Sequence, residues 1–248
     1  MKTASPRKHL FLRVAGFGIL AALTAAHAQT AVDITSDSHY HLLLKNDRVR
    51  VFEVSLRQPE RAMVRHEHNF LVITLTDSDM VMWPEGFSDV QSYRFGVGDV
   101  RFFFGGRAIG LRSNLTTEYR NITVEFMDAK VTTYGYQSGS GEWDYGASVV
   151  RAPVDPRAKF SNSIDLGAAT VSDVQLLQSD TLPKPDKPSA ELLVPVTDMD
   201  LKAESDIHIR KSPGEVLWLD PGRKADLRNV DTEPARFVVI EIPVKPGD

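Results

Sequence analysis

The chain has 248 residues, a formal net charge of −4 and no cysteine. The lack of cysteine excludes disulfides, thiolate metal sites and a lipid-anchored N-terminal cysteine. The acidic balance argues against nucleic acid as a partner, because binding to phosphates needs a basic surface.

The first 28 residues have the pattern of a secretory signal peptide. A basic front is followed by an uncharged, mostly apolar run over residues 14–25 and by Ala26-His27-Ala28, an A-x-A cleavage signal. The apolar run is too short to span a bilayer, which takes about 20 apolar residues. We expect cleavage after Ala28 and a bacterial protein that is periplasmic or secreted, without membrane contact once the signal is removed. An uncleaved N-terminal anchor is the alternative.

Short β-type runs dominate the rest of the chain. Residues 49–56 alternate in the period-two manner of a half-buried strand, and residues 71–75 are an almost continuous apolar run that ends in a turn composition. Gly, Pro, Asn and Asp punctuate such runs, and no segment has the pattern of a long amphipathic helix. Many short strands of this kind predict an all-β sandwich or barrel.

An internal repeat predicts two copies of one domain. Residues 98–126 match residues 214–242 without a gap, shifted by 116 positions, and Thr76–Asp79 matches Thr197–Asp200, shifted by 121. The coincident pairs include Gly98 and Gly214, Arg107 and Arg223, Arg120 and Arg236, and Glu125 and Glu241. A long repeat of this type marks a duplicated unit. We therefore expect a first domain at 29–135, a linker at 136–158 that begins with a flexible composition at Gln137–Gly141, and a second domain at 159–248.

Several segments resemble the cupin superfamily, and specifically a two-domain bicupin. The segment Asn46–Val51 is similar to the opening strand of small cupins, and His66-Glu67-His68 is similar to the H-x-H of the first cupin motif. The second motif is matched twice, by Gly98-Asp99-Val100, Gly105-Gly106 and Leu111-Arg112-Ser113-Asn114, and by Gly214-Glu215-Val216, Asp220-Pro221-Gly222 and Leu227-Arg228-Asn229. The resemblance implies an all-β chain of two tandem double-stranded β-helix (jelly-roll) domains, a fold that often holds a metal at the barrel centre.

The metal-binding motifs are incomplete. On a strand, residues i and i+2 face the same way, so an H-x-H would aim His66 and His68 into the barrel. The resemblance implies a glutamate where this chain has Val72 and Ile73, and a third histidine where it has Gly110. In the second copy, the H-x-H positions fall in a Pro-Lys-Pro-Asp-Lys-Pro loop. We therefore expect no cofactor, with a divalent metal held by His66 and His68 of the first domain as the alternative.

Three residues near the second motif are candidates for ligand binding. Phe102 and Phe104 lie in a strand whose alternate residues fill the barrel, and Arg112 recurs as Arg228 at the barrel mouth. The alternatives are core packing for the phenylalanines, and a solvated strand face or a structural salt bridge for Arg112.

The sequence favours an exported bicupin that binds a small molecule without catalysis or serves as a scaffold, and an enzyme is not favoured. The alternative is a metal-dependent cupin enzyme of the dioxygenase or isomerase type that uses His66 and His68. A structural role comparable to that of the storage-protein branch is a third hypothesis, and a homodimer is compatible with it. The sequence contains no nucleophile motif and no phosphate loop.

Overall fold

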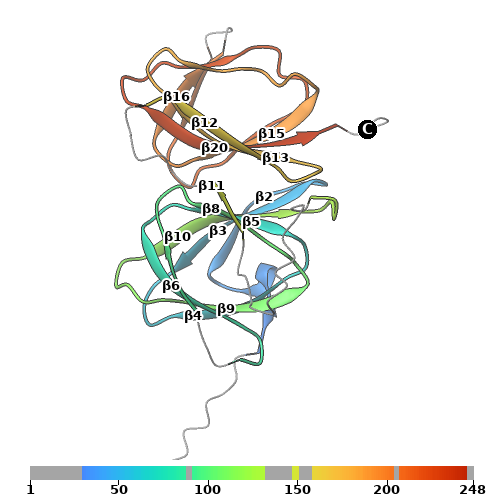
Figure 1. The fold of residues 1–248 in the computed structure, drawn as a ribbon, viewed down its shortest axis with the longest axis vertical. Helices are drawn as coiled ribbons and strands as arrows, with labels where there is room; N and C mark the ends of the chain where they lie inside the picture. Colours follow the sequence, from blue (N-terminus) through green and yellow to red (C-terminus); the bar gives the residue numbers. More distant parts are fainter. Residues whose placement is uncertain (1–29, 88–90, 132–146, 151–157, 204–206, 245–248) are drawn as a thin grey trace, which may run out of the picture.

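The structure, a computed structural model, describes residues 30–87, 91–131, 147–150, 158–203 and 207–244. The expected signal peptide lies outside these residues. Apart from one 3-10 turn at Ile34–Ser36, every element in the described residues is a strand, which confirms the all-β prediction. The described part holds no helix that is long and apolar enough to cross a bilayer. Figure 1 shows two β-barrels stacked along the long axis, the first drawn in blue to green and the second in yellow to red.

Two sheets form the first barrel. Their strand orders are β1-β4-β9-β6-β7 and β11-β8-β5-β10-β3-β2, so most neighbours in space are distant in sequence. The first sheet contains β1 (Val32–Asp33), β4 (Arg61–His66), β9 (Arg107–Ser113), β6 (Ser78–Pro84) and β7 (Gln91–Phe95). The second contains β11 (Ala147–Val150), β8 (Val100–Phe103), β5 (Phe70–Thr74), β10 (Tyr119–Phe126), β3 (Val49–Leu56) and β2 (Tyr40–Lys45).

The second barrel repeats this plan with fewer strands in the described residues. Its sheets have the orders β12-β13-β20-β15-β18 and β14-β19-β16-β17. The first of them contains β12 (Phe160–Asp165), β13 (Thr170–Leu176), β20 (Ala235–Pro243), β15 (Ser189–Pro195) and β18 (Leu217–Leu219). The other contains β14 (Thr181–Leu182), β19 (Leu227–Asn229), β16 (Met199–Lys202) and β17 (His208–Lys211).

Strand register shows that the two barrels are copies of one fold. Ile122 of β10 pairs with Ile73 of β5, and Val238 of β20 pairs with Val194 of β15. These pairs are offset by 116 (238 minus 122) and 121 (194 minus 73) positions, the same two offsets that relate the repeats in the sequence. The prediction of two tandem jelly rolls is therefore confirmed.

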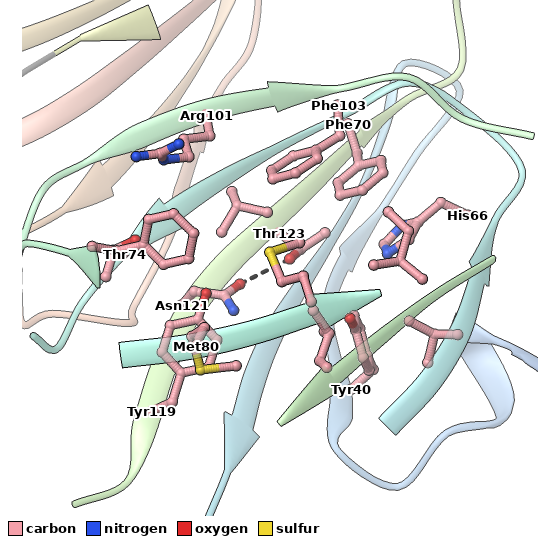
Figure 2. Close-up of a pocket in the computed structure, with 16 residues that line it drawn as sticks. Tyr40, His66, Phe70, Thr74, Met80, Arg101, Phe103, Tyr119, Asn121 and Thr123 are labelled. Carbon is pink, nitrogen blue, oxygen red and sulfur yellow. Dashed lines mark hydrogen bonds between the residues drawn. The ribbon is translucent and has the colours of Figure 1, made fainter. Parts of the chain in front are cut away.

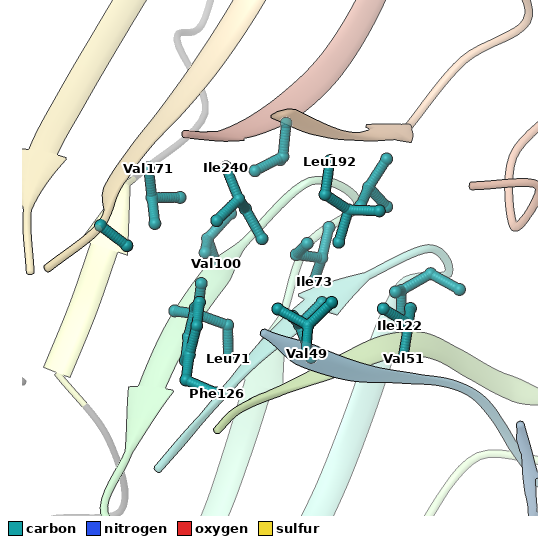
Figure 3. Close-up of a cluster of buried hydrophobic side chains, with 14 of the residues drawn as sticks. Val49, Val51, Leu71, Ile73, Val100, Ile122, Phe126, Val171, Leu192 and Ile240 are labelled. Carbon is teal, nitrogen blue, oxygen red and sulfur yellow. The ribbon is translucent and has the colours of Figure 1, made fainter. Parts of the chain in front are cut away.

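The two barrels pack against each other through one apolar core. Val49, Ile73 and Ile122 of the first barrel share this core with Leu192 and Ile240 of the second, and all five are completely buried. Figure 3 shows these side chains meeting between the two sheets. Full burial of one such side chain contributes about 1.5–3 kcal/mol, so the contact between the barrels is a major source of stability.

One strand lies within the predicted linker. Ala147–Val150, inside the segment 136–158, forms β11 and pairs with β8 at the edge of the first barrel. Pairing at a sheet edge satisfies backbone groups that would otherwise be open. The linker residues 136–146 and 151–157 lie outside the described residues.

Candidate functional site

The interior of the first barrel holds a small cavity of about 30 Å³. A water molecule needs roughly 10–15 Å³ of such space, so the cavity has room for about two waters in this conformation. Its middle is aromatic and aliphatic. Figure 2 shows His66 toward one end and Thr74 toward the other, with Phe70, Phe103 and Met80 between them.

His66 is the polar group at one end of the cavity. It is the last residue of β4 and only 2% exposed, and its Nδ1 lies 3.2 Å from Oε1 of Glu125. The ring stacks on Phe70 with centroids 3.7 Å apart. Burial lowers the pKa of His66, although the hydrogen bond with Glu125 opposes this effect. The imidazole is therefore mainly neutral at pH 7.

Glu125 is engaged on its other side by Arg50. The carboxylate is completely buried, and its Oε2 accepts a hydrogen bond of 2.8 Å from Nε of Arg50 and lies 2.6 Å from Nη2. The strand register explains this ion pair, because Arg50 of β3 and Glu125 of β10 are directly opposite each other. The result is a buried row of His66, Glu125 and Arg50.

The residues present do not fit the metal centre that the cupin resemblance implies. The strand β4 ends at His66, so His68 lies in the bend that follows. His68 is partly exposed, its Nε2 lies 3.8 Å from Oε2 of Glu67, and it does not line the cavity. Within the described ranges, no three His, Asp or Glu side chains are grouped to hold a metal ion. The carboxylate beside His66 is already neutralised by Arg50, whose charge opposes a second cation. The structure does not bring His66 and His68 together, and a metal at this pair stays a prediction.

The predicted ligand-binding residues lie elsewhere. Phe102 packs in the core between the barrels, Phe104 is 46% exposed, and Arg112 of β9 is not among the residues that line the cavity. The residues of β8 that face the cavity are Arg101 and Phe103, one position from Phe102 and Phe104, and ligand binding by the predicted residues stays a prediction. The physical reason is that the outer face of β8 is also buried, against the second barrel.

A polar pair that runs from the middle of the cavity toward Thr74 was missed by sequence reasoning (Figure 2). Oγ1 of Thr123 donates a hydrogen bond of 2.8 Å to Oδ1 of Asn121, and the Arg101 guanidinium lies 4.4 Å from the centre of the Phe95 ring. Burial raises the pKa of Tyr119, which keeps its hydroxyl protonated. The signal in the sequence was the alternation of polar Asn121 and Thr123 with apolar residues along β10.

The interior of the second barrel is different. It is filled by aliphatic and aromatic side chains, among them Leu193, Leu201, Phe237 and Val239. By strand register, Phe237 and Val239 stand where the first barrel has Asn121 and Thr123. The equivalent face of β20 therefore carries hydrophobic side chains in place of the polar pair.

Comparison with known proteins identifies the fold. No protein-family model matches the sequence, and no curated protein matches it. Among solved structures, AerE from Microcystis aeruginosa superposes with a TM-score of 0.62 at 8% identity, over 84% of this chain and 95% of that one. A cupin 2 conserved barrel domain protein from Leptotrichia buccalis has a TM-score of 0.55 at 10% identity, over 86% of this chain and 92% of that one. Salicylate 1,2-dioxygenase from Pseudaminobacter salicylatoxidans has a TM-score of 0.54 at 9% identity, over 82% of this chain and 76% of that one.

These neighbours agree with the internal repeat and with the strand register. The chain has the fold of the two-domain cupins, as the resemblance in its motifs implied. Identities of 10% or less carry the fold and leave activity open.

Proposed function

We propose that this protein binds a small molecule inside its first barrel, and that the second barrel supports the first. The observation that carries the proposal is the contrast between two copies of one fold. Asn121 and Thr123 face the cavity of the first barrel, whereas Phe237 and Val239 fill the same positions of the second. A polar pair that faces the cavity in one copy, and is replaced by hydrophobic side chains in the other, supports a role in recognition.

The cavity wall limits the chemistry of the ligand. With about 30 Å³ free, a ligand enters only if lining side chains move, and Met80 and Met82 are the flexible ones. The middle of the cavity offers the faces of Phe70 and Phe103 beside the hydroxyl of Thr123 and the amide of Asn121, and one end offers a neutral imidazole. This lining favours a small, mainly apolar molecule that carries hydrogen-bonding groups.

A titration of residues 29–248 tests the proposal. Salicylate and gentisate, which appear in the names of the dioxygenase structures, are suitable first probes, together with benzoate and a cyclic aliphatic acid. We expect at least one probe to bind in calorimetry and to shift NMR signals of residues that line the cavity. No binding at millimolar concentration across the panel would contradict the proposal.

A variant locates the binding. Asn121→Leu/Thr123→Val gives the first barrel the hydrophobic character of the second and should abolish binding. The reverse change in the second barrel, Val239→Thr, is the matched control and should leave binding intact. Binding that survives the double substitution would place the ligand elsewhere.

We propose binding without turnover, and the same samples address the enzyme alternative. Chemical change of a bound probe, with or without added divalent metal, would replace the binding role by an enzymatic one.

Export is also part of the proposal, and N-terminal sequencing of protein from the periplasm or medium should start at Gln29.

A further inference from the structure

The two barrels bury a carboxylate at the same end, at positions that differ between the copies. In the first barrel this is Glu125, which pairs with Phe70 across β10 and β5. In the second barrel the paired residues at the equivalent positions are Glu241 and Glu191. Glu125 is completely buried and Glu191 is 1% exposed. A carboxylate removed from water to this degree requires a positive partner.

Each buried carboxylate is met by an arginine of its own barrel. Arg50 reaches Glu125 at 2.6–2.8 Å, and its side chain is 12% exposed. Arg223 contacts Glu191 in a bidentate manner, with Nε 2.7 Å from Oε2 and Nη2 2.8 Å from Oε1, and its side chain is 8% exposed. Such paired contacts are among the strongest that a carboxylate makes in a protein.

The two arginines come from different parts of the fold. Arg50 lies on β3, where the second barrel has Thr170 at the equivalent register position. Arg223 precedes β19 and corresponds in the repeat to Arg107 of the first barrel, which is exposed. The guanidinium of Arg223 also donates to the carbonyl oxygens of Pro183 and Ala225, at 2.8 and 2.7 Å. The two ion pairs therefore use non-equivalent positions to build the same electrostatic arrangement in each barrel.

We propose that a guanidinium of the chain takes the place of a metal ion in each barrel, Arg50 in the first and Arg223 in the second. A guanidinium is permanently charged and fixed to the backbone, so it neutralises the carboxylate without a bound ion. A divalent cation at either position would meet the repulsion of the resident arginine at a few ångströms. This inference concerns the barrel ends and does not depend on the ligand proposed for the cavity.

Metal content is the first test. Residues 29–248, purified without chelator or histidine tag, are incubated with Zn²⁺, Mn²⁺, Fe²⁺ or Ni²⁺, desalted and measured by plasma mass spectrometry. We expect far less than one metal per chain, and a Tm that does not change with EDTA. Stoichiometric metal that is lost in His66→Ala or Glu191→Ala would overturn the proposal.

Charge neutralisation is the second test. Arg50→Met and Arg223→Met should each lower Tm by roughly 10 °C, because each leaves an uncompensated buried carboxylate. Adding Glu125→Gln to the first variant, or Glu191→Gln to the second, should restore most of the loss. Arg57→Met is the control, since the ion pair of Arg57 with Glu118 lies at the surface, and it should change Tm little.

Two outcomes of the second test speak against the proposal. If the glutamine substitutions restore nothing, the arginines act through packing and do not serve as counter-charges. If Arg50→Met or Arg223→Met fails to fold, Arg50→Lys and Arg223→Lys replace them. The lysine variants keep the positive charge, whereas Glu125→Ala and Glu191→Ala remove the carboxylate and leave the arginine unpaired. Each lysine variant should therefore lower Tm less than the alanine variant of its partner, and an equal or larger loss would contradict the assignment.

Discussion

The guanidinium of Arg236, in the second barrel, lies directly against the backbone of Gly98, in the first. Its Nη1 and Nη2 donate to the carbonyl oxygens of Val97 and Gly98 at 3.2 and 3.4 Å, while Asp173 holds it in place at 2.9 Å. A Cβ atom on Gly98 would lie 2.3 Å from Nη2. Glycine at position 98 therefore creates the space in which the second barrel docks.

The contact is reciprocal. Arg120 of the first barrel, held by Glu53, lies against Gly214 of the second, and a Cβ there would be 2.8 Å from its Nη2. Arg120 and Arg236 coincide in the sequence repeat, as do Gly98 and Gly214. The two barrels are thus related by an approximate two-fold arrangement in which each inserts an arginine against a glycine of the other.

Gly98→Ala should lower the free energy of unfolding by about 3 kcal/mol, from the strain of a side chain at positive φ and from the collision with Arg236. Gly86→Ala is the control, because both glycines have a φ of +84° and a Cβ on Gly86 meets nothing within 4 Å. That control should cost about 1 kcal/mol, from strain alone. Urea denaturation measures both values, and equal losses would show that the contact with Arg236 contributes nothing.

The shared core predicts that the two barrels unfold together. Trp83 lies in β6 and Trp218 in β18, so variants that lack Trp143 and keep only one of these two report on one barrel each. Both should give the same urea midpoint, and Leu192→Ala should lower stability by about 3 kcal/mol for both probes. Leu42→Ala, at a side chain 45% exposed, is the control with little effect. Two separate midpoints would contradict the idea of a common core.

Phe102 and Phe103 offer a test of which face of β8 meets the ligand. Both side chains are at least 96% buried, but Phe102 packs between the barrels and Phe103 lines the cavity. Phe102→Leu and Phe103→Leu should each cost about 1 kcal/mol of stability. Only Phe103→Leu should change the affinity for a ligand of the first barrel, as measured by calorimetry. A larger change in affinity from Phe102→Leu would reverse this assignment.

Glu241 predicts a pH effect on stability. Burial raises the pKa of Glu241, the negative charges of Glu191 and Asp186 raise it further, and the positive charge of Arg223 lowers it. On the neighbouring strand β13, Glu241 is paired with Thr170, which carries no charge. Because the folded pKa is above the unfolded value, the charged form is disfavoured in the fold, and stability is lost as pH rises through the folded pKa. Glu241→Gln should therefore raise Tm at pH 7, and the gain should vanish below about pH 4.5. An equal gain at pH 4 would point to a cause other than charge.

The architecture could be predicted from the sequence because the offsets of the sequence repeat are the same as the offsets between equivalent strand pairs. Pairing across β10 and β5 recurs in β20 and β15, so the two offsets of the repeat follow from conserved strand pairing. The strand β11 could not be predicted, since Ala147–Val150 pairs with a strand more than 40 residues earlier in the chain and its neighbours have a flexible composition.

The site was less predictable, for local reasons. A run of three phenylalanines has no alternation, so it cannot show which of them faces the barrel when both faces are buried. An H-x-H pattern does not show where its strand ends, and β4 ends at His66. The partners of His66 and Glu191, by contrast, lie 59 and 32 residues away along the chain and depend on tertiary packing.

The shared core also sets an order of events during synthesis. The first barrel leaves the ribosome with the outer face of β3, β5 and β10 uncovered, because Leu192 and Ile240 have not yet been made. At 5–20 residues per second, that face stays bare for roughly ten seconds while the second barrel is translated. During this interval the nascent chain carries an apolar surface that attracts chaperones or another copy, and completion of the second barrel removes it.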